Sequence, residues 1–177
     1  MRPHDHRIVR LSYRGAPQTV EVIKKAVIDS QSKPSVRLIA EEITKHLRSK
    51  DTVSEGLAFY NFVLDKTRYM RDPRTVEYVR APWIIVDQIL AGHTPGVDCD
   101  DISALICALA AASGAECRVV TVAFKNMFYR GKRQYSHVFA QIKEPRTGTW
   151  ITLDPVAGEK TPEMMRRVVA GKVWPVA

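Results

Sequence analysis

The chain has 177 residues, of which 45% are hydrophobic and 26% are charged, as expected of a globular domain with a core of its own. No apolar run is long enough to span a membrane, so no membrane partner is expected. The net charge of +8 favours acidic partners. The lysines and arginines are nevertheless scattered and accompany no nucleic-acid motif, so we expect a solvated basic surface, and nucleic-acid binding through it is only a third and weaker hypothesis.

The amino terminus, MRPHDHRIVR, is polar and lacks the apolar segment of a signal peptide, which predicts a cytoplasmic protein. The three cysteines are an odd number and offer no disulfide framework. Cys99 and Cys107 would lie about 12 Å apart on one helix, too far for a disulfide. Reduced thiols in a reducing compartment are therefore expected.

The first half of the chain predicts mainly helices. Residues 8–13 are expected to form a short strand. Apolar residues then recur at helical spacing in three segments, residues 20–28, 35–47 and 57–64. Ser35 is the expected cap of the second of these helices. After a polar connection over residues 68–82, Pro82 is expected to open a short helix that Gly92 ends.

The second half predicts one long helix followed by strands. Residues 99–113 form the expected central helix, with Gly114 as its stop. Three strands are expected after it, at residues 116–124, 136–142 and 150–153, and a final helix at residues 161–170. This order predicts an α+β fold in which N-terminal helices and a central Cys-bearing helix pack on an antiparallel sheet of three or more strands.

Cys99 is the candidate nucleophile because it stands at the start of the central helix. Backbone N–H groups and the helix dipole stabilise a thiolate at that position. Three acidic neighbours, Asp98, Asp100 and Asp101, oppose the negative charge. Unless these carboxylates cap the helix or point outward, a histidinium partner is needed to stabilise the thiolate.

His137 and Asp154 are the candidate partners, on two strands joined by the turn-like residues 144–148. Opposite residues of an antiparallel hairpin have a constant sum of numbers, and pairing these two (137 + 154 = 291) centres the connection inside that turn. This register predicts Cβ atoms about 4.5–5.5 Å apart. One imidazole nitrogen would bind the carboxylate, which leaves the other for the thiol. Alternation places the expected core residues on the opposite face: Val138, Ala140, Ile142, Ile151 and Leu153.

This arrangement suits acyl transfer through a thioester. Cys99 would attack an amide carbonyl, His137 would act as general base and then general acid, and Asp154 would orient His137. The backbone N–H of Cys99 is one candidate oxyanion donor, and Gln88 and Trp83 are the candidates for a second. No cofactor and no metal are expected, because catalytic zinc sites rarely use a Cys, His and Asp together.

Several segments carry a resemblance to a known family: Cys99-Asp100-Asp101, residues 113–120, His137-Val138-Phe139 and residues 150–155. A helix-opening Cys, a His-bearing strand and a strand end with Asp-Pro, in this order, resemble the transglutaminase-like superfamily, in a stand-alone bacterial or phage type. The resemblance covers about residues 55–156. It implies a papain-like fold and cysteine-dependent hydrolysis or amine transfer on a protein or peptide substrate. Residues 1–50 are expected to be a helical extension, and residues 51–177 the catalytic domain.

The sequence also supports an alternative in which the fold is kept without the chemistry. Two residues, Val97 and Asp98, separate Gly96 from Cys99, where the family usually has one residue. The acidic neighbours of Cys99 and the lack of an evident second oxyanion donor also favour a protein without catalytic activity. The alternative is a catalytically silent binding or assembly module. No oligomeric state is indicated.

Overall fold

The computed structural model describes residues 8–12, 16–73 and 76–176. The helices are α1 (Ala16–Gln31), α2 (Pro34–Thr44), α3 (Thr52–Lys66), α4 (Pro82–Leu90), α5 (Cys99–Ala112) and α6 (Thr161–Arg166), with the short 3₁₀ helix η1 (Gly158–Lys160). The strands are β1 (Ile8–Ser12), β2 (Arg68–Tyr69), β3 (Val76–Arg80), β4 (Gly96–Val97), β5 (Cys117–Ala123), β6 (Phe128–Tyr129), β7 (Lys132–Arg133), β8 (His137–Lys143), β9 (Trp150–Leu153) and β10 (Ala170–Pro175).

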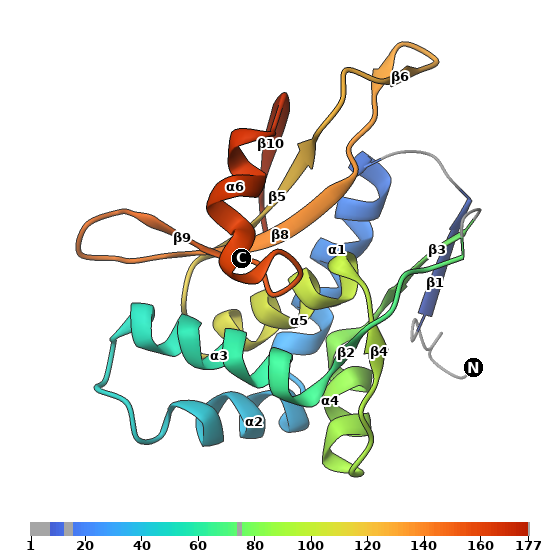
Figure 1. Cartoon of the computed structure of the whole chain (residues 1–177). Helices are drawn as coiled ribbons and strands as arrows, with labels where there is room; N and C mark the ends of the chain where they lie inside the picture. Colours follow the sequence, from blue (N-terminus) through green and yellow to red (C-terminus); the bar gives the residue numbers. More distant parts are fainter. Residues whose placement is uncertain (1–7, 13–15, 74–75, 177) are drawn as a thin grey trace.

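The main sheet has the strand order β10-β5-β8-β9, and every neighbouring pair in it is antiparallel. Helices α1 to α4 lie on one side of α5, and the sheet lies on the other (Figure 1). The remaining strands form separate two-stranded pieces, β1 with β3, β2 with β4, and β6 with β7. The predicted α+β class, with a central helix packed on an antiparallel sheet, is confirmed. No helix in the described ranges is long and apolar enough to cross a membrane.

Helix α5 is the centre of the core. Every residue from Asp100 to Ala110 is buried. A helix with alanine, leucine and isoleucine on all sides can be covered all round, and α5 packs against α1, α2, α3 and α4 as well as β8. Its position therefore fixes Cys99, its first residue, relative to the sheet.

The N-terminal helices belong to the same core. Val20, Ile23 and Val27 of α1 and Val36 and Ile39 of α2 lie in one buried cluster with α5. A domain boundary near residue 50 stays a prediction. Helix α2 begins at Pro34 with Lys33 as its N-cap, so the prediction that Ser35 caps it is wrong. The reason is that the fixed φ of proline suits the first helical position.

The β8–β9 hairpin differs from prediction in its register. Ala140 pairs with Leu153 and Lys143 with Trp150, a constant sum of 293 rather than 291. The turn centre moves because Gly148 adopts a φ of 72° and the Glu144 side chain accepts backbone N–H groups within the turn. An even shift leaves each side chain on its predicted face. The expected core residues accordingly lie in or against the core: Val138, Ala140, Ile142, Ile151 and Leu153.

The carboxyl-terminal segment also differs from prediction. The helix expected over residues 161–170 ends at Arg166, and β10 follows it as an edge strand on β5. Trp174 anchors this strand, because its Nε1 donates to Thr121 Oγ1 at 2.9 Å. Tertiary pairing here overrides the local helical pattern. Residue 13, the end of the first predicted strand, lies outside the described residues.

All three cysteines are free thiols. Cys107 and Cys117 are 0% and 1% exposed and lie in the main core cluster. Cys99 alone among them is half-buried. The structure therefore separates one accessible thiol from two that only unfolding would expose.

Candidate active site

Asp98 caps α5 immediately before Cys99. Its Oδ1 accepts the N–H groups of Asp100 and Asp101, at 3.0 and 3.2 Å. The Sγ of Cys99 lies 3.7 Å from Asp100 Oδ1, within hydrogen-bonding distance for sulfur. The thiol thus stands where the helix dipole favours negative charge and next to a carboxylate that opposes it.

Asp101 is held at the start of α5 by β3. Its Oδ1 accepts the N–H of Arg80 at 2.7 Å, and its Oδ2 lies 3.9 Å from the Arg80 guanidinium. Burial raises the pKa of Asp101 to about 7; the negative charge of Asp98 adds to this rise, and the bonds to Arg80 oppose it. Near neutral pH this carboxyl is therefore partly protonated and adds less negative charge to the helix start.

His137 and Asp154 form a direct hydrogen bond. His137 Nε2 lies 2.7 Å from Asp154 Oδ2, and the Asp154 side chain is 1% exposed. Its Oδ1 accepts the N–H groups of Val156 and Ala157, at 3.1 and 3.2 Å, and this turn fixes the carboxylate from behind. Extending the observed register places Asp154 opposite Phe139, so its side chain reaches His137 along the diagonal of one face.

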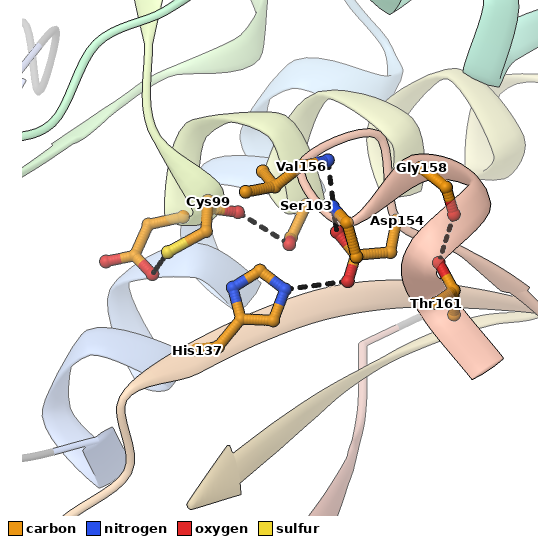
Figure 2. Close-up of polar contacts among 9 residues, drawn as sticks. Cys99, Ser103, His137, Asp154, Val156, Gly158 and Thr161 are labelled. Carbon is orange, nitrogen blue, oxygen red and sulfur yellow. Dashed lines mark hydrogen bonds and ion pairs between the residues drawn. The ribbon is translucent and has the colours of Figure 1, made fainter. Parts of the chain in front are cut away.

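The His137 ring lies between Cys99 and Asp154 (Figure 2). Its Nε2 points to Asp154, while Nδ1 lies on the side of Cys99. Phe124 and Phe139 flank the ring, with centroids 6.5 and 6.1 Å from that of the imidazole. The structure thus brings the three predicted residues together, with the carboxylate on the far side of the imidazole from the sulfur.

Two cavities meet at Cys99 and His137. One has a volume of about 600 Å³ and lies against α1; the other has a volume of about 730 Å³ and lies against the segment around α6. Both are bordered by the same residues at their junction: Asp98, Phe124, Ser136 and Arg167. Within the described ranges, no group of three or more His, Cys, Asp or Glu side chains could hold a metal ion. An extended substrate could pass from one cavity to the other over the sulfur.

Trp83 and Gln88, the expected second oxyanion donors, lie on α4 and line neither cavity. The Lys33 ammonium lies 5.5 Å from the Trp83 ring centroid, and Gln88 Oε1 accepts from the Arg80 guanidinium at 3.5 Å. The structure does not bring these two side chains to Cys99.

Tyr69 is a site residue that the sequence pattern did not indicate. The parallel two-residue ladder of β2 and β4 places it opposite Val97, near the start of α5. It lines the larger cavity together with Cys99 and His137. Burial raises the pKa of Tyr69, and the negative charge of a Cys99 thiolate adds to the rise. The phenol therefore stays protonated at neutral pH and can donate a hydrogen bond.

Comparison with known proteins identifies the fold. The family model of the transglutaminase-like superfamily matches residues 37–155. A solved structure named as a "putative protease" from Parabacteroides distasonis ATCC 8503 aligns with 80% of this chain at 15% identity and a TM-score of 0.56. Another, named as a "putative cysteine protease" from Cytophaga hutchinsonii, aligns with 95% at 17% identity and a TM-score of 0.49.

This chain spans 27% of the first of those structures and 58% of the second. A comparison with curated proteins found no significant match. The family model, in contrast, covers more than half of the 177 residues, and it includes the helix and strands that carry Cys99, His137 and Asp154. The chain therefore belongs to the transglutaminase-like superfamily.

Proposed function

We propose that this protein is a cysteine-dependent amide hydrolase or acyltransferase that acts on a protein or peptide through a thioester at Cys99. The observation that carries the proposal is the 2.7 Å bond between His137 Nε2 and Asp154 Oδ2, with the other ring nitrogen on the side of Cys99. This bond favours the imidazole tautomer with its proton on Nε2, which leaves Nδ1 able to accept the thiol proton.

In the first half of the reaction, Nδ1 of His137 takes the proton of the Cys99 thiol, and Sγ attacks the substrate carbonyl carbon. A carbon–sulfur bond forms as the carbonyl oxygen becomes an oxyanion. When the oxyanion collapses, the carbon–nitrogen bond breaks and the leaving amine takes the proton from His137. The products are a thioester on Cys99 and a free amine. Asp154 stabilises the imidazolium that exists between the two proton transfers.

In the second half, His137 takes a proton from water or from an acceptor amine, which attacks the thioester carbonyl. The carbon–sulfur bond then breaks, and the sulfur regains a proton. Water yields a carboxylic acid, whereas an amine yields a new amide. We favour hydrolysis, because water is always present as an acceptor.

The backbone N–H of Cys99 and the phenol of Tyr69 are the proposed oxyanion donors. Cys99 contributes the first N–H of α5, where the helix dipole also favours negative charge. Tyr69 lines the cavity in which the oxyanion would form. Replacing Tyr69 with Phe should slow turnover about tenfold or more while leaving the fold unchanged.

Alkylation with iodoacetamide at neutral pH, followed by peptide mapping, tests the proposal. Cys99 should react much faster than an ordinary accessible thiol, and His137→Ala should remove that advantage. Cys107 and Cys117 provide a control in the same molecule, because both are buried and label only if the protein unfolds. A Cys99 rate equal to that of free cysteine, unchanged by His137→Ala, would contradict an activated nucleophile.

A silent binding or assembly module is the second candidate, and the 3.7 Å contact between Cys99 Sγ and Asp100 Oδ1 favours it. A thiol that donates to a carboxylate is held in its neutral form. Asp100→Asn separates the two candidates. It should raise the alkylation rate of Cys99 if the thiol is a nucleophile under restraint, and it should change nothing if the thiol is inert.

A further inference from the structure

The segment of residues 125–135, here called the β6–β7 hairpin, carries only positive charge. Its four cationic residues are Lys125, Arg130, Lys132 and Arg133, and it contains no Asp or Glu. The turn between the strands has φ values of 49° at Arg130 and 74° at Gly131, a left-handed pair typical of tight hairpins. Figure 1 shows the hairpin reaching away from the sheet, beyond β5 and β8.

The arginines of the hairpin are stacked on its aromatic rings. The Arg133 guanidinium lies 4.7 Å from the Phe128 ring centroid, and its Nη1 donates to Asn126 Oδ1 at 2.7 Å. Arg130 lies 5.4 Å from the centroid of Tyr129. A guanidinium held over a ring loses less conformational freedom when it binds a carboxylate, and its fork of N–H donors fits the two carboxylate oxygens.

The hairpin is continuous with the cavity beside α1. Lys125, Met127 and Gln134 line that cavity together with Cys99 and His137. Arg167, at the end of α6, borders the same cavity. The positive charge therefore extends from the hairpin to the mouth of the cleft, whereas Asp98 and Asp100 lie buried at its floor.

We propose that the β6–β7 hairpin docks an acidic segment of the protein or peptide whose amide reacts at Cys99, an inference that rests on the proposed function. Arg133 precedes His137 by four residues, which span at most about 13 Å of extended chain. A substrate chain of similar rise places the acidic side chains about four residues from the reacting amide. The substrate class is thus a polypeptide with acidic residues at one side of the reaction point.

Charge alone would also suit nucleic acid, but two observations favour a peptide. Phe128 and Tyr129 each have a guanidinium over one face, so their rings are less available for base stacking. The hairpin also leads directly to the cavity that holds Cys99, and a thioester forms from an amide.

Fluorescence anisotropy with the full-length Cys99→Ala protein tests docking without turnover. The probes are a labelled peptide with a run of glutamates, the same peptide with glutamines, and an oligothymidylate of equal charge. The triple variant Arg130→Gln, Lys132→Gln and Arg133→Gln removes three of the four hairpin charges and leaves Lys125, which lines the cavity beside Cys99. The matched control, Lys25→Gln, Arg37→Gln and Arg48→Gln, removes equal charge from exposed positions in α1, in α2 and in the connection between α2 and α3, none of which lines either catalytic cavity.

We expect the glutamate peptide to bind about tenfold more tightly than the glutamine peptide, with that advantage lost in the hairpin variant and kept in the control. Equal loss in both triple variants, or equal binding of the two peptides, would overturn the proposal. Tighter binding of oligothymidylate would overturn it in favour of a nucleic-acid surface.

Alkylation of Cys99 in the wild-type protein, measured in parallel, tests the docking proposal and the proposed function separately. Fast alkylation without selective peptide binding overturns the docking role alone. Selective binding with an unreactive Cys99 overturns the claim that the bound segment is a substrate.

Discussion

Replacing Asp154 with Asn tests the carboxylate behind His137 with almost no change of shape. In the wild-type protein, Oδ2 lies 2.7 Å from His137 Nε2, and Oδ1 accepts the N–H groups of Val156 and Ala157. An asparagine that keeps both backbone bonds must turn its NH₂ group toward His137. Nε2 then becomes an acceptor, so the ring proton moves to Nδ1, and Nδ1 can no longer take the proton of Cys99.

A hydrogen bond to a charged group contributes about 1.5–3 kcal/mol, which corresponds to about a 10- to 150-fold change in rate. Asp154→Asn should therefore slow the alkylation of Cys99 at neutral pH by about that factor. The assay is a quenched time course with iodoacetamide, in which the adduct on each cysteine is quantified by mass spectrometry. A wild-type rate at Cys99, while Cys107 and Cys117 stay protected, would refute a role for the carboxylate.

Three further predictions concern the stability of the structure around the site. Asp98→Ala removes an acceptor of two N–H groups at the start of α5 and should lower the free energy of unfolding by about 1–2 kcal/mol in urea titrations. Asp98→Asn keeps an acceptor oxygen and should lose much less of this free energy. Gly56→Val should cost about 2–3 kcal/mol in the same assay, because even a Cβ at that position would overlap Ile142 Cδ1. Burial raises the pKa of Asp101 from 3.8 to about 7, so the folded protein keeps a proton that the unfolded chain releases. Stability should therefore fall by a few kcal/mol as the pH rises from about 4 to about 7, and unfolding measured across this range should show a smaller fall in Asp101→Asn.

Hydrophobic periodicity predicted those parts of the fold that are long and regular. α5 and β5 were predictable because each carries a dense series of apolar residues, and both series lie within residues 102–124. β10 was not predictable, because Ala170–Pro175 is stabilised as an edge strand by its pairing with β5 rather than by its own pattern. The two-residue ladders, such as β2 with β4, are too short to leave any periodic signal.

The pairing of His137 with Asp154 could be predicted because it does not depend on the exact register of the hairpin. The register of the hairpin was wrong by two residues, yet an even shift keeps His137 and Asp154 on one face, and a carboxylate can reach a diagonal neighbour. No comparable pairing rule relates Trp83 and Gln88, the oxyanion candidates on α4, to Cys99. Tyr69 reaches the cavity through a parallel bridge between segments almost thirty residues apart in the sequence, a contact that local patterns do not encode.

The burial of α5 has a consequence for how this site can change in evolution. Cys99 stands at the tip of a helix whose next eleven residues, Asp100 to Ala110, are enclosed on every side. Any substitution that moves the sulfur must therefore also repack the interior, and most such variants would be lost to misfolding. New specificities are accessible instead through the solvent-facing segments at residues 125–135 and 159–163, where insertions and charge reversals leave the interior untouched. Libraries diversified only there should yield folded proteins with altered preferences.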